Sequence, residues 1–88
     1  MRLDKFLKVA RIIKRRTIAK EACDKKQVLI NDRPAKAGAE VNTGDLISIH
    51  LGQRRLKIKV AAVKDTVPAK EAAMLYELIE DHKIKHEL

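Results

Sequence analysis

The chain has 88 residues, enough for one small domain, and it carries a formal net charge of +8. Its single cysteine excludes an internal disulfide, and no apolar run approaches the about 20 residues that a membrane-spanning helix needs. The charge is clustered, since residues 1–36 hold 12 lysines and arginines against 4 acidic residues, whereas residues 37–88 hold 8 of each. Such a cluster favours binding to nucleic acid or to an anionic membrane surface, with a merely solubilising basic face as the alternative. A cytoplasmic protein is expected because charges interrupt the N-terminal segment and the single cysteine gives no sign of an oxidising compartment.

The first predicted helix begins close to the start of the sequence. Leu3, Phe6, Leu7 and Ala10 follow the i, i+3, i+4, i+7 spacing of one buried helix face. Asp4 falls in the first turn, where a carboxylate suits the positive end of the helix dipole. The basic residues of this segment therefore point away from the predicted core.

A second helix is predicted from about Ile18 to Lys25, with Thr17 as its N-cap. Ala19, Ala22 and Cys23 give this helix a narrow face of small residues. Small side chains let two helix backbones approach closely, so we expect the two helices to pack as a pair.

A small antiparallel sheet is predicted next. The β-prone residues 28–30 stop at Asn31-Asp32, a dipeptide that tolerates positive φ and is typical of a tight hairpin turn. Pro34 restricts the returning arm to a sheet edge. Residues 46–51 and 56–60 alternate apolar and polar side chains around a glycine turn, which predicts two half-buried strands.

A third helix is predicted to begin at Pro68. Its apolar stripe would consist of Ala72, Leu75, Tyr76 and Ile79. Its outer face would be acidic, with Glu71, Glu77, Glu80 and Asp81. Residues 82–88 are expected to fray. The predicted fold class is α+β, a helical pair packed on a small antiparallel sheet with a C-terminal helix.

Residues that could support catalysis or metal binding are sparse. His82 and His86 have i, i+4 spacing, but no ligand set accompanies them or His50. Cys23 is interpreted as a buried core thiol. The sequence has no glycine-rich phosphate loop and no nucleophile motif, so we expect no enzymatic activity, no metal and no cofactor.

The basic helical pair is better suited to RNA than to other anions. With one Tyr, one Phe and no Trp, stacking on single-stranded bases is disfavoured, and shape and backbone recognition of double-helical RNA is expected. Arg16 would lie just before the second helix and Arg2 just before the first, so the two could contact phosphates on opposite sides of one groove. A helix-turn-helix DNA-binding protein and a peripheral membrane module remain as alternatives.

The order of motifs along residues 1–51 resembles the S4-type RNA-binding domain, which is named after a small-subunit ribosomal protein. The motifs that carry the resemblance are Arg2-Leu3-Asp4-Lys5, Lys14-Arg15-Arg16-Thr17, Val28-Leu29-Ile30-Asn31, Val41 and Gly44-Asp45-Leu46-Ile47. The resemblance implies the αL-type helical-pair fold and RNA contact through that pair. It implies a division into an RNA-binding domain, residues 1–63, and a C-terminal helical extension with a tail, residues 64–88.

Carried over by position, the resemblance points to RNA contacts at Arg2, Lys5, Arg16 and Lys20, with Asn31 at the hairpin. The remaining cations of the basic stretch that we include in the predicted site are Lys14, Arg15, Lys25 and Lys26. Family members usually have glycine where Lys26 stands and often where Asp32 stands. Lys26 in a left-handed helix cap would be strained by about 1 kcal/mol relative to glycine.

The whole chain is most similar to bacterial heat-shock-type ribosome-associated proteins, and among these to the RqcP group. That resemblance implies binding to ribosomal RNA of the large subunit when it carries a stalled peptidyl-tRNA, with tRNA itself as a second partner. It implies assistance to ribosome-associated quality control and alanine tailing alongside a NEMF-type protein (RqcH). A general ribosome-associated stress factor is the alternative within the family. We expect a monomer.

Overall fold

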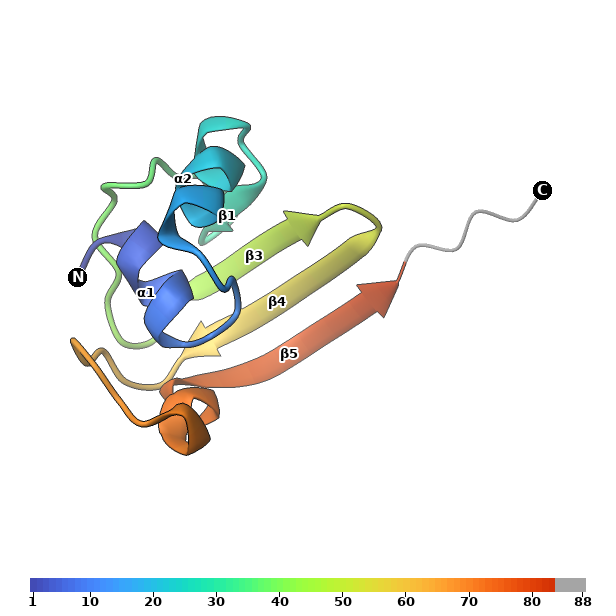
Figure 1. Cartoon of the computed structure of the whole chain (residues 1–88). Helices are drawn as coiled ribbons and strands as arrows, with labels where there is room; N and C mark the ends of the chain where they lie inside the picture. Colours follow the sequence, from blue (N-terminus) through green and yellow to red (C-terminus); the bar gives the residue numbers. More distant parts are fainter. Residues whose placement is uncertain (84–88) are drawn as a thin grey trace.

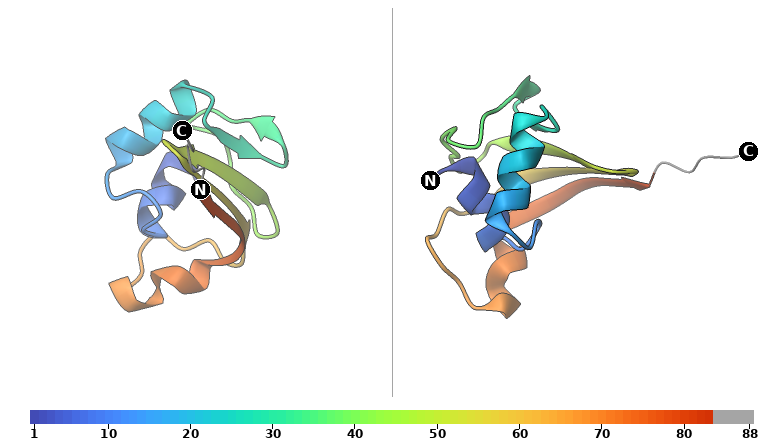
Figure 2. Two further views of the ribbon diagram at one scale, coloured as in Figure 1. Left: turned by 90° about the vertical axis from the view of Figure 1, so that its right-hand side faces the viewer. Right: turned by 45° about the horizontal axis from the view of Figure 1, so that its top comes forward.

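The computed structural model describes residues 1–83 as two layers, a helical pair on one face of a five-stranded antiparallel sheet (Figures 1 and 2). The sheet order is β2-β1-β3-β4-β5. In chain order the elements are α1 (Leu3–Val9), α2 (Arg16–Asp24), β1 (Val28–Ile30), β2 (Arg33–Pro34), β3 (Leu46–Leu51), β4 (Arg54–Val60), the 3-10 helix η1 (Ala69–Leu75) and β5 (Tyr76–Lys83). The predicted α+β class is confirmed. No helix within the described residues is long and apolar enough to span a membrane.

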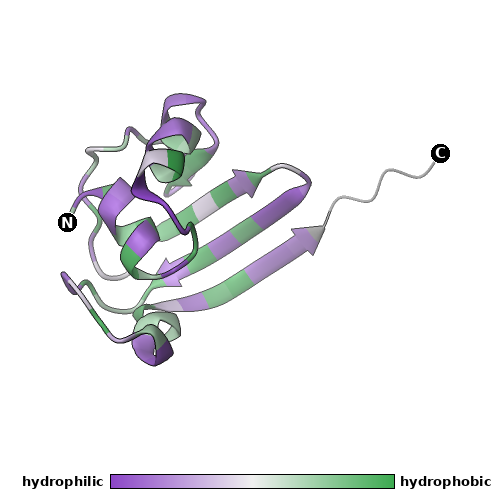
Figure 3. Ribbon diagram, in the orientation of Figure 1, coloured by the Kyte–Doolittle hydropathy of each residue, from purple (hydrophilic) through white to green (hydrophobic). Residues whose placement is uncertain are grey.

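The core lies between the helical pair and the sheet. Leu3, Phe6 and Leu7 are fully buried, so the predicted apolar stripe of α1 does face inward. Ala19 and Cys23 of α2 are buried as well, which confirms the predicted face of small residues. The strands alternate as predicted, and Figure 3 shows apolar and polar bands along β3 and β4.

Both helices end in the same hydrogen-bonded cap, a Schellman motif. Arg11 N–H donates to the Lys8 carbonyl and Ile12 N–H to the Leu7 carbonyl, at 2.9 and 3.0 Å. After α2, the Lys26 N–H donates to the Cys23 carbonyl and the Gln27 N–H to the Ala22 carbonyl. Arg11 and Lys26 have φ of 57° and 60°, so each helix places a cation in a left-handed position that glycine adopts more easily. The predicted left-handed conformation of Lys26 is confirmed.

The predicted hairpin turn is also confirmed. Asn31 and Asp32 have φ of 51° and 68°, and β1 pairs with β2 through Leu29 opposite Pro34. Two positive φ values define the primed turn whose twist matches that of the flanking strands. Pro34 lies on β2, an edge strand of the sheet, where the missing N–H of proline removes no ladder bond.

Helix α2 begins earlier than the sequence predicts. Arg15 is its N-cap and Arg16 its first residue, so the prediction of Thr17 as N-cap is wrong. The backbone of Arg15 is extended, and its carbonyl accepts from Ile18 and Ala19, both at 3.1 Å. The helix therefore starts without a side-chain cap, and Thr17 falls in the first turn as an exposed residue.

The predicted third helix is correct in place and wrong in length. It follows Pro68 as η1 and buries Ala72 and Leu75, but it ends at Leu75. The chain then forms β5, which pairs with β4, so the predicted helical stripe through Ile79 does not exist. Pairing supplies β4 with hydrogen-bond partners along its outer edge, which a helix would leave unpaired.

Charge also favours the strand over the helix. Glu77 lies opposite Lys59 and Glu80 opposite Lys57, and opposite charges across a strand pair stabilise it. His82 therefore belongs to β5 and not to a frayed tail. Residues 84–88, which include His86, lie outside the described part of the chain.

Candidate nucleic-acid interface

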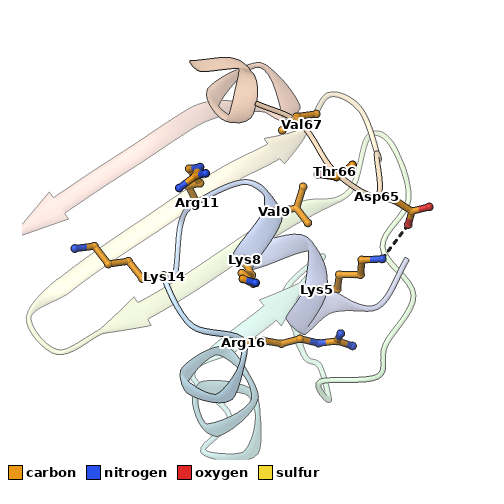
Figure 4. A pocket seen from close by; sticks show the side chains of 9 residues that line it. All are labelled: Lys5, Lys8, Val9, Arg11, Lys14, Arg16, Asp65, Thr66 and Val67. Atoms are coloured by element: carbon orange, nitrogen blue, oxygen red, sulfur yellow. Dashed lines mark hydrogen bonds and ion pairs between the residues drawn. The ribbon is translucent and has the colours of Figure 1, made fainter. Parts of the chain in front are cut away.

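Basic side chains gather along two grooves on either side of the helical pair. The first, here called the α1 groove, has a volume of about 530 Å³ and runs between α1, the start of α2 and the loop before η1 (Figure 4). Its lining residues are Lys5, Lys8, Val9, Arg11, Lys14, Arg16, Asp65, Thr66 and Val67. Asp65 contacts Lys5 at 3.1 Å across this groove.

The second groove, here called the α2 groove, lies between α2 and residues 34–38 and has a volume of about 540 Å³. Arg2, Lys20, Lys26 and Lys36 supply its cations. Its floor is more apolar than that of the α1 groove, because small side chains such as Ala35 and Ala37 line it. The two grooves together give the helical pair a cationic surface suited to phosphate groups.

Asp4 connects the two grooves. Its side chain is only 4% exposed, and its carboxylate accepts from Arg2 Nε at 3.2 Å and pairs with Arg16 Nε at 3.2 Å. The backbone N–H of Lys5 donates to the same carboxylate at 2.8 Å. Arg2 lines the α2 groove and Arg16 the α1 groove, so one buried carboxylate joins a cation from each.

These contacts keep Asp4 ionised. Burial by itself raises the pKa of the Asp4 carboxyl, but hydrogen bonds from Arg16 and Arg2, the charge of Arg16 and the Lys5 N–H outweigh burial and lower that pKa below its ordinary value of 3.8. Besides its predicted place in the first turn of α1, Asp4 therefore also pairs with two arginines. Both arginines meet at this carboxylate, and their contact with phosphates on opposite sides of one groove stays a prediction.

The structure brings most of the predicted site residues together. Lys5, Lys14 and Arg16 line the α1 groove, and the α2 groove has Arg2, Lys20 and Lys26. Arg15 and Lys25 are exposed on the helical pair but line neither groove.

Asn31 is held by bonds within the protein. Its Oδ1 accepts from the Leu46 N–H at 3.0 Å, and its Nδ2 donates to Asp45 Oδ1 at 3.2 Å. These bonds tie the β1–β2 turn to the turn before β3, which is a structural role. Contact between Asn31 and RNA stays a prediction.

Three groove cations were not among the predicted site residues. Lys8 and Arg11 continue the three-residue spacing that begins at Lys5, a signal already present in the sequence. Lys36 reaches the α2 groove only because residues 34–38 pack beside α2, and sequence spacing gives no indication of that.

Side chains suited to other chemistry are not assembled in this part of the molecule. Within residues 1–83, no three His, Cys, Asp or Glu side chains are placed to hold a metal ion. Cys23 is buried, and burial, followed by the charges of Asp4 and Asp24, raises the pKa of its thiol to about 11. A thiol with that pKa stays protonated near neutral pH and is a poor nucleophile.

Comparison with known proteins gives consistent matches over nearly the whole chain. The S4 domain family model matches residues 1–47. The RQC P-site tRNA stabilizing factor of Halalkalibacterium halodurans is 48% identical over 84 residues, which cover 96% of each chain. The protein of the same name from Bacillus subtilis is 45% identical over 84 residues, covering 96% of this chain and 98% of that one.

Solved structures agree with these sequence matches. The trimeric structure of Vibrio cholerae Heat Shock Protein 15 superposes with a TM-score of 0.84 at 31% identity, covering 90% of this chain and 81% of that chain. The solution structure of HP1423 gives a TM-score of 0.77 at 32% identity, with coverage of 91% and 98%.

Proposed function

The chain belongs to the S4 domain family and, within it, to the RQC P-site tRNA stabilizing factors, and from this membership we propose that it binds structured RNA on the large ribosomal subunit. The RNA in question is ribosomal RNA together with the tRNA of a stalled peptidyl-tRNA. The observation that carries the proposal is the row of cations along the α1 and α2 grooves, joined at the Arg2–Asp4–Arg16 cluster.

The recognition would be of RNA shape and backbone. The groove cations are long and exposed, and they lie along two tracks beside one another, as phosphates of a helical RNA do. No Phe, Tyr or Trp lines either groove, so base stacking would contribute little. Residues 1–63 would serve as the RNA-binding domain and residues 64–88 as its C-terminal extension, of which β5 adds a strand to the sheet. Arg15, Lys25 and Asn31 would contact the same RNA from the rim of this surface.

The protein would act as a clamp, with no bond chemistry of its own, in the cytoplasm where ribosomes work. By holding the peptidyl-tRNA it would assist ribosome-associated quality control and alanine tailing alongside a NEMF-type partner (RqcH). We also propose that it works as a monomer. The outer edge strand β5 carries acidic side chains, and the β4–β5 register shifts between Lys57 and Ile58, features that discourage edge-to-edge pairing of two copies.

Cosedimentation with purified ribosomal subunits tests the proposal. The wild-type protein should pellet with large subunits that carry peptidyl-tRNA, more weakly with empty large subunits, and least with small subunits. Lys14→Ala and Lys20→Ala, which remove one exposed cation from each groove, should each weaken binding by about fivefold, the loss expected for one exposed ion pair.

Lys57→Ala is the matched control because it removes the same charge from the other face of the sheet. Lys57 lies on β4 between the buried Leu56 and Ile58, so its side chain points away from the helical pair. Binding by this variant should equal that of the wild type. Equal losses in all three variants would mean that overall charge and not the grooves binds the subunit, and would overturn the proposal.

A further inference from the structure

The Asp4 carboxylate contacts two nitrogens of each of two arginines. Arg2 donates to it from Nε at 3.2 Å and from Nη2 at 3.4 Å, and Arg16 donates from Nη2 at 3.4 Å and forms an ion pair through Nε at 3.2 Å. The carboxylate is buried, whereas the side chains of Arg2 and Arg16 remain 55% and 45% exposed. One edge of each guanidinium is therefore fixed, while about half of each arginine side chain remains accessible to solvent.

The exposed part of each guanidinium retains hydrogen-bond donors. A guanidinium has more N–H groups than a bidentate contact uses, and these groups lie in a rigid plane. Fixing one edge therefore aims the remaining donors in a set direction. Two arginines without a shared anion would repel each other and would lose side-chain entropy when they bound a phosphate.

We propose that Asp4 is a positioning residue, which joins Arg2 and Arg16 into one unit that binds the same phosphate or two adjacent phosphates of one RNA strand. This inference rests on the proposed RNA binding. The unit lies where the two grooves meet, since Arg16 lines the α1 groove and Arg2 the α2 groove. The phosphate there would take the N–H groups that Asp4 leaves free.

Asp4 could act on RNA binding through its charge alone or by positioning the arginines, and the two roles predict opposite changes in RNA affinity when Asp4 is neutralised. Asp4 is an anion close to the RNA surface, so its neutralisation should strengthen RNA binding if only net charge matters. If Asp4 aims the two arginines, its neutralisation should weaken binding even though the protein becomes more positive. The sign of the change in affinity therefore separates the two roles.

Asp4→Asn tests this inference, with large ribosomal subunits carrying peptidyl-tRNA as the binding partner. The substitution preserves side-chain size and should weaken binding by about tenfold, because the Arg2 and Arg16 donors are no longer fixed. Circular dichroism should show a folded protein. Asp24→Asn and Asp65→Asn are the matched controls, since each removes one carboxylate from a groove, and both should bind more tightly than the wild type.

Equal or tighter binding by a folded Asp4→Asn variant would overturn the inference while the proposed function stands. Failure of the wild-type protein to bind the subunits would instead overturn the proposed function. If Asp4→Asn does not fold, the inference can be tested by NMR on the wild-type protein, both free and bound to a short RNA duplex. The Arg2 Nε–H and Arg16 Nη2–H protons, which donate to Asp4, should exchange slowly with water in both free and bound protein, and fast exchange of both in the complex would contradict positioning.

Discussion

Asp4 stays ionised inside the protein because Arg2, Arg16 and the Lys5 N–H donate to its carboxylate. A buried carboxylate without such partners would cost several kcal/mol, and the same contacts leave both arginines half-exposed. At the scale of single residues, one ion-pair cluster therefore supports the fold and, in the proposed role, RNA binding as well. Changes to Arg2 or Arg16 should affect both.

The lowered pKa of Asp4 predicts a loss of stability in acid. A carboxyl whose folded-state pKa lies below its ordinary value of 3.8 stabilises the fold above that pH, and this contribution disappears as pH falls through the folded-state pKa. Between about pH 5 and pH 2, the free energy of unfolding should therefore fall less in Asp4→Asn than in the wild type. At neutral pH, Asp4→Asn should lower it by about 2 kcal/mol, the net value of a hydrogen bond to a charged group.

Urea denaturation at each pH measures these free energies. Asp24→Asn, which removes an exposed carboxylate, serves as the control, and its free energy of unfolding should fall in acid as much as that of the wild type. An Asp4→Asn curve parallel to that of the wild type would contradict the assigned role of Asp4.

The two helix caps combine strain with function at the scale of the element. Arg11 and Lys26 both lie in left-handed positions that close Schellman motifs, and both line a groove. Glycine would adopt this backbone at lower cost. We interpret these two cations as residues that cost some stability and in return supply a positive charge to each groove.

Arg11→Gly and Lys26→Gly should therefore raise the free energy of unfolding by about 0.5–1 kcal/mol each and weaken binding to large ribosomal subunits. Thermal denaturation and cosedimentation measure the two effects in the same samples. The neighbouring Lys25→Gly is the control, since Lys25 has φ of −85° and glycine there should lower stability. A loss of stability in all three variants would show that the left-handed caps are not strained.

Charge is separated between the two halves of the molecule. The helical pair holds the excess cations, whereas in the sheet the acidic residues of β5 pair with the lysines of β4, for example Glu80 opposite Lys57. The part of the chain after residue 36 is neutral overall, so the excess positive charge lies on the side of the helical pair. We therefore expect the molecule to bind RNA with its helices inward and with the other sheet face away from the RNA.

Binding that depends on phosphate contacts should be sensitive to salt. With about six contacts, affinity for large ribosomal subunits should fall by about a thousandfold between 50 and 200 mM monovalent salt. The double variant Lys14→Ala, Lys20→Ala should reduce the slope of log affinity against log salt by about two, and Lys57→Ala should leave it unchanged. Equilibrium binding across a salt series measures the slope. An affinity independent of salt would indicate a protein partner in place of RNA.

The sequence by itself determined the features that depend on neighbours along the chain. The apolar stripe of residues 3–10 and the primed turn at Asn31-Asp32 follow from side-chain periodicity and local backbone preference. The left-handed Lys26 followed from the resemblance, because family members usually have glycine at that position. Together with the clustered charge and the S4-type motifs, they were sufficient for the fold class and for RNA as the partner.

Only the tertiary structure decided the features that depend on distant partners. Residues 76–83 have a pattern compatible with a helix, and they become a strand because β4 offers an edge to pair with. Arg2 and Arg16 are 14 positions apart in the sequence, and only the packing of α1 against α2 brings both to Asp4. Local propensity is a short-range property, whereas pairing and burial depend on which segments the fold places side by side.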